Sequence, residues 1–216
     1  MKKITFRGYN RFKFQSLKLG RSVFCNSQLL RDFLLDLEWD LKIRSYEIWP
    51  FKFIYQEEGR NKTFRPHLVF DTNENHRSAV WLKSIDPGSE ETYSRTIRLI
   101  TELCARQSLG FLVKSPAEVR RVPYFSNLKI LQRYSRCEIS IDQLFLCHDF
   151  FSQFPTPLLG DLAEFFAYRD QPPAVVFALL SQRIVAGDLD NFRLDYDFPI
   201  ELINEFPNFE NRGLMS

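Results

Sequence analysis

Basic side chains fill the first part of the chain, which has no acidic residue before Asp32. Aromatic residues, among them Phe6, Tyr9, Phe12 and Phe14, lie between them. The eight basic residues are Lys2, Lys3, Arg7, Arg11, Lys13, Lys18, Arg21 and Arg31. Such a segment binds phosphates with a salt-sensitive, sequence-independent affinity, and aromatic rings can stack on unpaired bases. It therefore predicts nucleic-acid binding; the alternative is a solubilising arm whose rings pack on the core.

A second group of basic residues lies near the middle of the chain, and it consists of Arg120, Arg121, Lys129, Arg133 and Arg136. These residues either line the same groove as the first segment or pair with acidic residues elsewhere. Nine positions are the predicted DNA-binding residues: Lys2, Lys3, Arg7, Arg11, Lys13, Lys18, Arg21, Arg120 and Arg121.

The small net charge of +2 hides a division along the chain. Residues 1–136 hold 25 Lys and Arg against 14 Asp and Glu, a balance of +11. Residues 137–216 hold 4 against 13, a balance of −9. This asymmetry predicts separate partners, a polyanion for the first part and a basic or uncharged one for the second; the alternative is that the two parts attract each other.

The length of 216 residues suits one large or two small domains, and 26% charged residues argue against a membrane-embedded protein. No apolar run approaches the roughly 20 residues that span a bilayer. The amino terminus lacks the apolar stretch of a secretory signal. We expect a cytoplasmic protein with no membrane partner.

The four cysteines, Cys25, Cys104, Cys137 and Cys147, have no C-x-x-C spacing, and the three histidines form no zinc pattern with them. We expect reduced, structural cysteines and neither a metal ion nor another cofactor. Cys104 lies on an apolar helical face, where a thiol packs as a small hydrophobe.

The first half reads as an α/β unit. Ser27 is a plausible N-cap for a helix over residues 27–39, which has apolar residues at helical spacing. Extended stretches follow over 45–56, 65–72 and 79–85, separated by turn-rich pieces at 57–61 and 72–77. A helix over 89–108 then leads at Gly110 into another strand, which predicts a crossover and a parallel pair. A short helix capped by Ser115 and a longer one after Pro123 end this half.

Helices dominate after Arg136. The pattern predicts three of them, over 140–154, 158–168 and 172–187, with prolines at the start of the third and Gly187 at its end. A short extended pair over 188–199 completes the outline of a winged helix. We assign residues 1–136 to an α/β domain with a basic arm, 137–203 to an acidic winged helix and 204–216 to a tail.

Several short sequence motifs follow one another along the first 131 residues of the chain. Residues 27–34 read SQLLRDFL, and Trp49-Pro50 precedes the next strand. Residues 64–68 read FRPHL and residues 80–83 read VWLK. Two further strings are GFLVKSPAEVRRVP, from Gly110 on, and NLKIL, from Asn127 on.

In order and spacing these strings resemble the TnsA family, the endonuclease subunit of heteromeric transposases. The corresponding family patterns are S-x-x-E-R-D-F-L, Q-P, Y-x-P-D-F, V-(E/Q)-x-K, G-x-x-F-x-V and N-L-K-L-L. The resemblance implies a restriction-endonuclease-like PD-(D/E)XK core, a mixed sheet flanked by helices, followed by a winged helix. In that family the carboxy-terminal region engages partner proteins, which implies the same role for residues 189–202 and the helices behind them.

At the positions that match the family's metal ligands, this chain has residues that do not bind Mg²⁺. An acidic helix residue, the aspartate of P-D and the acidic or amide residue of E-x-K gather a divalent metal in such enzymes, and Leu30, His67 and Trp81 stand there instead. Only Lys83 keeps the type that the family has. Mg²⁺ demands oxygen ligands, whereas leucine has none and the indole nitrogen only donates. A lone histidine is more often structural than a ligand, so we assign His67 no catalytic role.

A displaced site is the alternative. Asp32, Asp36, Asp71 or Glu74 would then supply the carboxylates for Mg²⁺, although Asp32 faces away from Leu30 on the helix. Trp81 shares a strand face with Lys83 and would fill the metal pocket. We therefore expect a degenerate nuclease domain.

Three functions remain open from the sequence. The first is a TnsA-like subunit that binds DNA through its basic half and a transposase subunit or AAA+ regulator through its acidic winged helix, without cleaving DNA. The second is an endonuclease that cuts transposon ends with Lys83 and relocated carboxylates. The third is a regulatory or defence DNA-binding protein that reuses the fold. In all three, the predicted recognition helix at 172–187 has one basic residue, Arg183, and is poorly suited to major-groove reading.

Overall fold

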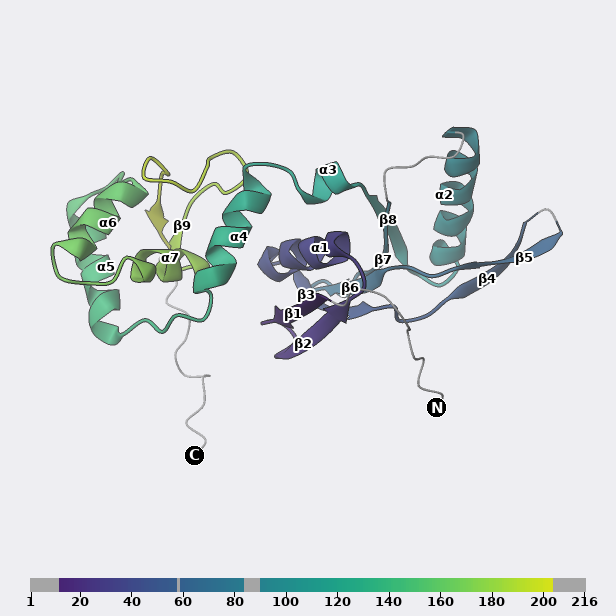
Figure 1. The fold of residues 1–216 in the computed structure, drawn as a ribbon, viewed down its shortest axis with the longest axis horizontal. Coiled ribbons are helices and arrows are strands. Elements are labelled where there is room, and N and C mark those ends of the chain that lie inside the picture. The colour runs from purple at the N-terminus through teal and green to yellow at the C-terminus, as the bar shows by residue number, and fades with distance from the viewer. Residues whose placement is uncertain (1–11, 58, 84–89, 204–216) are drawn as a thin grey trace, which may run out of the picture. The chain divides into compact units, whose positions relative to one another are not determined.

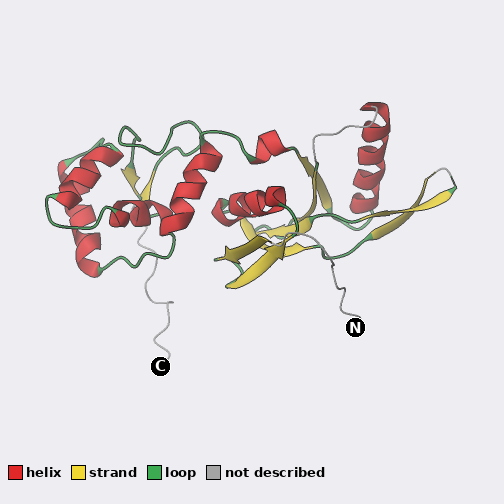
Figure 2. Cartoon of the chain, viewed as in Figure 1, coloured by secondary structure: helices red, strands yellow, loops and turns green. Residues whose placement is uncertain are grey.

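The computed structural model of the protein describes residues 12–57, 59–83 and 90–203 (Figure 1). The chain divides after Arg120 into two compact units, and each is described by itself. The first unit contains a mixed sheet with helices and the second is mostly helical (Figure 2), which confirms the α/β class expected from the sequence. The units divide at residue 120, earlier than the position 136 at which the charge balance changes.

A four-stranded mixed sheet forms the centre of the first unit, in the order β3-β6-β7-β8. The strands are β3 (Ile43–Ile48), β6 (Leu68–Thr72), β7 (Arg77–Leu82) and β8 (Gly110–Lys114). The neighbours β3–β6 and β6–β7 are antiparallel, whereas β8 is parallel to β7. A parallel pair requires a crossover, and α2 (Glu90–Ala105) supplies it. The predicted strand–helix–strand crossover is confirmed.

Helix α1 (Gln28–Trp39) begins where the sequence indicates. The Ser27 hydroxyl accepts a hydrogen bond from the backbone N–H of Leu30 at 3.1 Å, which caps the helix. The buried apolar residues of α1 are Leu30, Phe33, Leu34, Leu35 and Leu37. The helix contacts β1 (Phe12–Ser16), β2 (Arg21–Cys25) and α3 (Pro116–Val119). The expected Ser115 cap of α3 is present, in a capping box with Glu118.

Two antiparallel hairpins in this unit were not expected. One pairs β1 with β2, inside the segment that the sequence assigned to a basic arm. The other pairs β4 (Phe53–Glu57) with β5 (Arg60–Phe64), although residues 57–61 read as a turn. Strand β5 was not predicted because its first four residues are all exposed, so the sequence shows no hydrophobic alternation there.

Glu38 fastens the β1–β2 hairpin to α1. Its carboxylate accepts hydrogen bonds from the Ser16 hydroxyl, from the Leu17 and Lys18 backbone N–H groups at 3.0 and 3.1 Å, and from the Tyr46 hydroxyl at 2.7 Å. Hydrogen bonds to a charged acceptor are stronger than neutral ones. Burial and the adjacent carboxylate raise the pKa of Tyr46, so its hydroxyl stays a donor.

Aromatic and aliphatic side chains between the sheet and α2 form a hydrophobic core. Its buried members are Phe53, Phe64, Val69, Ala79, Ile100 and Cys104. The thiol of Cys104 is fully buried on α2, as predicted, and all four cysteines are free thiols. Because Phe53 and Phe64 belong to this core, it anchors the base of the β4–β5 hairpin.

Four helices form the framework of the second unit over the range 121–203. They are α4 (Tyr124–Tyr134), α5 (Ile141–Gln153), α6 (Leu159–Ala167) and α7 (Ala174–Ser181). The three helices predicted after residue 136 are confirmed. Helix α4 packs on α7, with the Tyr134 and Phe177 rings stacked 4.9 Å apart. No helix in the described part of the chain is both long and apolar enough to cross a membrane.

Short strands complete the second unit. β9 (Val185–Ala186) pairs antiparallel with β10 (Glu201–Leu202), and Leu158, just before α6, bridges Pro199. The predicted extended pair within 188–199 is wrong in position, because the two strands flank this segment instead. We call residues 187–198 the wing loop, after the wing that the sequence predicts near this position.

Gly187 does not end the third helix, contrary to the expectation. Helix α7 ends at Ser181, and Arg183 takes the left-handed conformation after it, with φ of 61°. Gly187 follows β9, where an added Cβ would lie 2.3 Å from Cε1 of Phe198. Close packing of the wing loop therefore explains this glycine.

Candidate functional site

The positions aligned with the nuclease motifs lie on α1 and at one end of β6 and β7. Leu30 is fully buried in the apolar face of α1. The register pairs Leu68 with Val80, so His67, just before β6, lies opposite Trp81. Lys83 follows β7 directly. The structure thus brings His67, Trp81 and Lys83 together, while Leu30 is a core residue.

The ring of His67 is bonded to the backbone of the neighbouring strand. Its Nδ1 atom accepts a hydrogen bond from the Leu82 N–H at 3.2 Å, and its own backbone N–H donates to the Val80 carbonyl at 2.9 Å. A neutral imidazole that accepts at Nδ1 holds its proton on Nε2. Burial lowers the pKa of His67 to about 4, so the ring is neutral at pH 7. In this arrangement neither ring nitrogen offers a free lone pair to a metal ion.

We expect NMR titration of the His67 ring to give a pKa near 4, below the ordinary value of about 6.5. Between these values the unfolded chain binds the proton and the folded one does not, so stability rises with pH across this window and falls as pH drops through it. In His67→Asn the amide oxygen can accept the bond from Leu82 but does not titrate, so this pH dependence should disappear. The NMR signal that is missing in this variant is assigned to the His67 ring. A pKa of about 6 or higher for that signal would contradict the prediction.

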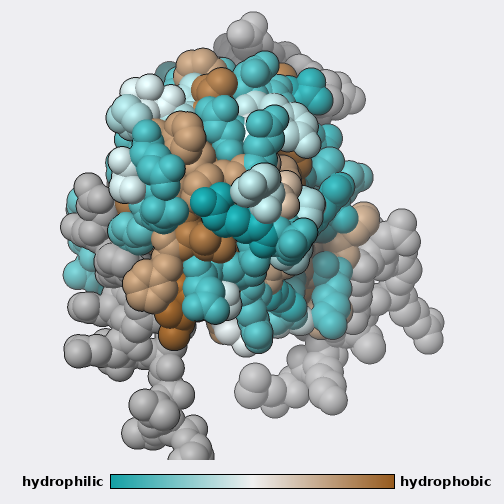
Figure 3. Space-filling model, turned by 90° about the vertical axis from the view of Figure 1, so that its left-hand side faces the viewer, coloured by the Kyte–Doolittle hydropathy of each residue, from teal (hydrophilic) through white to brown (hydrophobic). Residues whose placement is uncertain are grey.

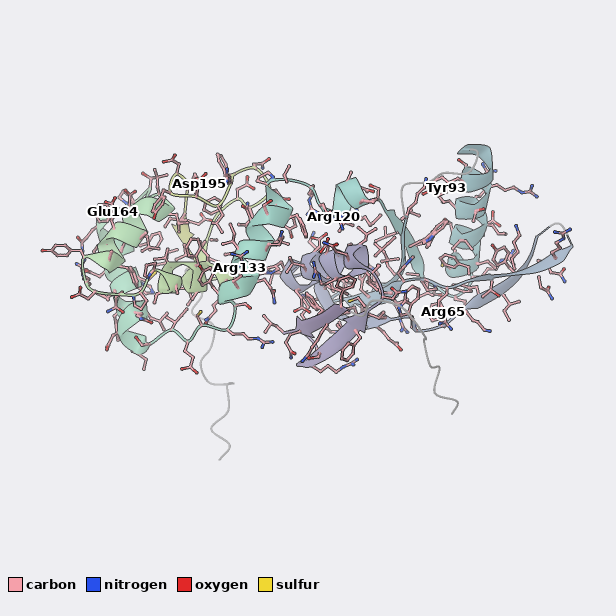
Figure 4. The ribbon with its side chains drawn as sticks, in the orientation of Figure 1. Arg65, Tyr93, Arg120, Arg133, Glu164 and Asp195 are labelled. Carbon is pink, nitrogen blue, oxygen red and sulfur yellow. The ribbon has the colours of Figure 1, made fainter. Side chains whose placement is uncertain are left out.

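Trp81 and Lys83 both contact Tyr93 of α2, which is labelled in Figure 4. The Trp81 ring centroid lies 5.7 Å from that of Phe64 and 5.9 Å from that of Tyr93. The Nζ atom of Lys83 lies 3.3 Å from the Tyr93 centroid, where the ring quadrupole attracts a cation. The two residues share a face of β7, as expected, and the surroundings of this face are aromatic.

Two aromatic neighbours of this site were not predicted as part of it, although Trp49 belongs to the Trp49-Pro50 string. Trp49 has a φ of 55°, an uncommon left-handed conformation for a bulky residue. Its backbone N–H donates to the His67 carbonyl at 3.1 Å, and its ring centroid lies 4.8 Å from that of the His67 imidazole. Phe111 of β8 packs edge-on against Phe64 at 5.7 Å. Only the density of aromatic residues in the sequence pointed toward such a cluster.

The carboxylates named for a displaced site have separate surroundings, and Asp36 is half-buried on α1. Asp32 is buried and pairs with Arg120 at 2.8 Å and with Arg31 at 3.3 Å. Asp71 accepts from the Ser45 hydroxyl, and Glu74 lies exposed beside His76. Within residues 12–57, 59–83 and 90–203, no group of three or more His, Cys, Asp or Glu side chains could hold a metal ion.

The predicted DNA-binding residues have different environments. Lys13 and Arg21 are exposed on β1 and β2. Lys18 donates its ammonium to the backbone oxygens of Asp40 and Ile43, and Arg120 pairs with Asp32. Arg121 lies over the Tyr124 ring and 3.5 Å from the Asp190 carboxylate. Lys2, Lys3, Arg7 and Arg11 lie outside the described residues.

The observed division changes the charge balance of the two parts. Residues 1–120 hold 21 Lys and Arg against 14 Asp and Glu, or +7, and residues 121–216 hold 8 against 13, or −5. The difference arises because α4 and its flanks, which are basic, belong to the second unit. The first unit remains the basic one.

Basic residues on and beside the β4–β5 hairpin were not among the predicted DNA-binding residues. Lys52, Arg60 and Lys62 are exposed, and Arg65 is half-buried at the base of the hairpin (Figure 4). The signal was available, since four of the fourteen residues from 52 to 65 are Lys or Arg. It was overlooked because this segment was divided between a strand and a turn.

Asn127 of α4 holds the wing loop in place. Its amide nitrogen donates to the carbonyls of Leu189 and Phe192 at 2.9 and 2.8 Å, and its oxygen accepts from the Leu194 N–H at 2.9 Å. The Asn127 side chain is fully buried. The string NLKIL therefore contributes a structural amide in addition to the apolar face of α4.

Apolar side chains are exposed on the second unit as well. Ile141, Phe145 and Tyr168 are 70%, 70% and 88% exposed, and Tyr196 in the wing loop is 73% exposed. Figure 3 shows hydrophobic side chains interspersed with hydrophilic ones on one face of the protein. Large exposed apolar side chains are typical of surfaces that bind proteins when they are contiguous.

No protein-family model matches the chain, and a search of curated proteins finds no significant relative.

Proposed function

We propose that the protein is a TnsA-like subunit of a DNA transposition complex that binds DNA and partner proteins without cutting DNA itself. The first unit has the mixed sheet flanked by helices that the resemblance implies. A fold alone is a weak argument for function. The chemistry of the residues at the nuclease positions carries the proposal.

The deciding observation is the state of His67, Trp81 and Lys83. His67 is neutral and its Nδ1 accepts from the Leu82 N–H, Trp81 is packed against Phe64 and Tyr93, and the Lys83 ammonium lies on the Tyr93 ring. Phosphodiester cleavage with Mg²⁺ requires carboxylate ligands around an open metal position. Among the residues that the structure describes, no group of three or more His, Cys, Asp or Glu side chains could provide such a set.

The second unit supports a winged-helix domain that binds protein. Its helices α5, α6 and α7 are followed by β9, the wing loop and β10, with Leu158 bridging Pro199. Helix α7 is almost wholly apolar and largely buried, which leaves little polar surface for reading bases. Its partner is a transposase subunit or an AAA+ regulator, docked on the wing loop and the helices behind it.

The experiment measures binding and cleavage in parallel. The purified protein should retard duplex DNA and should leave supercoiled plasmid intact in Mg²⁺ or Mn²⁺, also when the neighbouring transposition proteins are present. Nicking that is lost in Lys83→Ala would favour an active endonuclease instead. If the protein retains no transposition protein in pull-downs with or without DNA, the complex is ruled out and a regulatory or defence role is favoured.

A further inference from the structure

The β4–β5 hairpin has two faces of different chemistry. Residues Phe53, Tyr55 and Phe64 share one face and pack in or against the hydrophobic core. Since side chains alternate along a strand, the other face turns away from that core. It carries Lys52, Ile54, Gln56, Asn61, Thr63 and Arg65, which we call the outer hairpin face.

This outer hairpin face is ordered by the strand register. Ile54 pairs with Thr63 and Gln56 with Asn61, while Lys52 and Arg65 flank the Phe53–Phe64 pair at the base. Ile54 is 64% exposed, and Lys52, Gln56, Asn61 and Thr63 are also exposed. None of the six residues is acidic. The face therefore offers two cations at its base, amides toward its tip and methyl groups between them.

The hairpin is held firmly enough to present this face. Isolated two-stranded hairpins are marginally stable, but here Phe53 and Phe64 are buried, with their rings stacked 6.3 Å apart. Phe64 also contacts Trp81 and Phe111. Figure 1 shows β4 and β5 extending as a ribbon away from the four-stranded sheet.

We propose that the outer hairpin face is a DNA-binding ribbon that enters the major groove of duplex DNA. The major groove admits a two-stranded ribbon, and asparagine and glutamine recognise adenine there through paired hydrogen bonds. The methyl groups of Ile54 and Thr63 suit contact with thymine, and Lys52 and Arg65 suit the phosphates at the groove edge. The inference rests on the proposed DNA binding and names the element responsible for it.

The test uses the full chain and duplexes of about 30 base pairs with a randomised centre. Lys52→Ala/Arg65→Ala should weaken binding to all sequences and lower the slope of log affinity against log salt by about 2, since two phosphate contacts are lost. Gln56→Ala/Asn61→Ala should leave that slope unchanged and reduce the preference for selected over random sequences about tenfold. In the wild type, guanine N7 atoms within the bound site should be protected from methylation, because they face the major groove.

Lys42→Ala/Arg44→Ala is the charge-matched control, since these residues lie at the opposite end of β3 from the hairpin. It should retain the salt slope, the sequence preference and the N7 protection. If the wild type binds duplex DNA but the hairpin variants match this control, the proposal that the hairpin binds DNA is wrong, while the proposal that the protein binds DNA is retained. Hairpin variants that lose only single-strand binding would also overturn the proposal for the hairpin. A wild type that binds no DNA would overturn both proposals.

Discussion

Replacing Asn127 by alanine should lower the free energy of unfolding of the second unit by about 3 kcal/mol. The change leaves the Leu189 and Phe192 carbonyls and the Leu194 N–H without the partner that now satisfies them. Since the side chain is fully buried, water does not replace it without a change in structure. Denaturant unfolding measures the loss, and hydrogen exchange at the Leu194 amide localises it to the wing loop.

Two further variants sharpen the experiment on Asn127. Asn127→Asp keeps the acceptor for Leu194 but places a carboxylate against two carbonyl oxygens, so at neutral pH it should be less stable than the alanine variant. Asn191→Ala is the control, because this exposed amide of the same loop bonds only Asp188 among the contacts seen; its cost should stay below about 1 kcal/mol. Equal effects of Asn127→Ala and Asn191→Ala would show that burial of the amide is unimportant.

Loss of Arg120 should destabilise the first unit, although its position near the middle of the chain suggested a DNA contact. Its Nε lies 2.8 Å from the Asp32 carboxylate, whose side chain is only 5% exposed. Arg120→Leu leaves that buried carboxylate with Arg31 alone, and we expect a cost of about 3 kcal/mol. Unfolding of the variant in urea measures it.

The neighbouring residue provides a matched control. Arg121 is as exposed as Arg120, at 43% against 41%, but its partner Asp190 is 62% exposed. Arg121→Leu should therefore cost at most about 1 kcal/mol. In the double variant Asp32→Leu/Arg120→Leu most of the lost stability should return, because no unpaired charge stays buried. A double variant less stable than Arg120→Leu would contradict this account.

Local sequence signals predicted much of the fold. The caps at Ser27 and Ser115 and the strand–helix–strand crossover were correct because each follows from hydrophobic spacing and a few neighbouring residues. Strand β5 was missed because its exposed polar residues gain their strand structure from pairing with β4. The strands β9 and β10 were misplaced by a few residues because their pairing depends on contacts distant in the sequence.

The candidate site shows the same limit. The absence of carboxylates at positions 30, 67 and 81 is visible in the sequence, since residue type decides what can bind Mg²⁺. Two other features are not visible in the sequence: the hydrogen bond from the Leu82 N–H to the His67 ring and the position of Lys83 over Tyr93. They depend on strand register and on the position of α2. The roles of Lys18 and Arg120 as partners of internal groups also required three-dimensional structure.

The aromatic packing around Trp81 sets a condition for introducing metal ligands at this end of the sheet. A carboxylate at position 81 removes ring contacts with Phe64 and Tyr93 before it gains a metal partner, and a carboxylate at position 67 gives up the ring that pairs with Trp49. Each of these changes alone should therefore lower stability. Metal ligands at both positions would require the strand ends and their aromatic neighbours to be redesigned together.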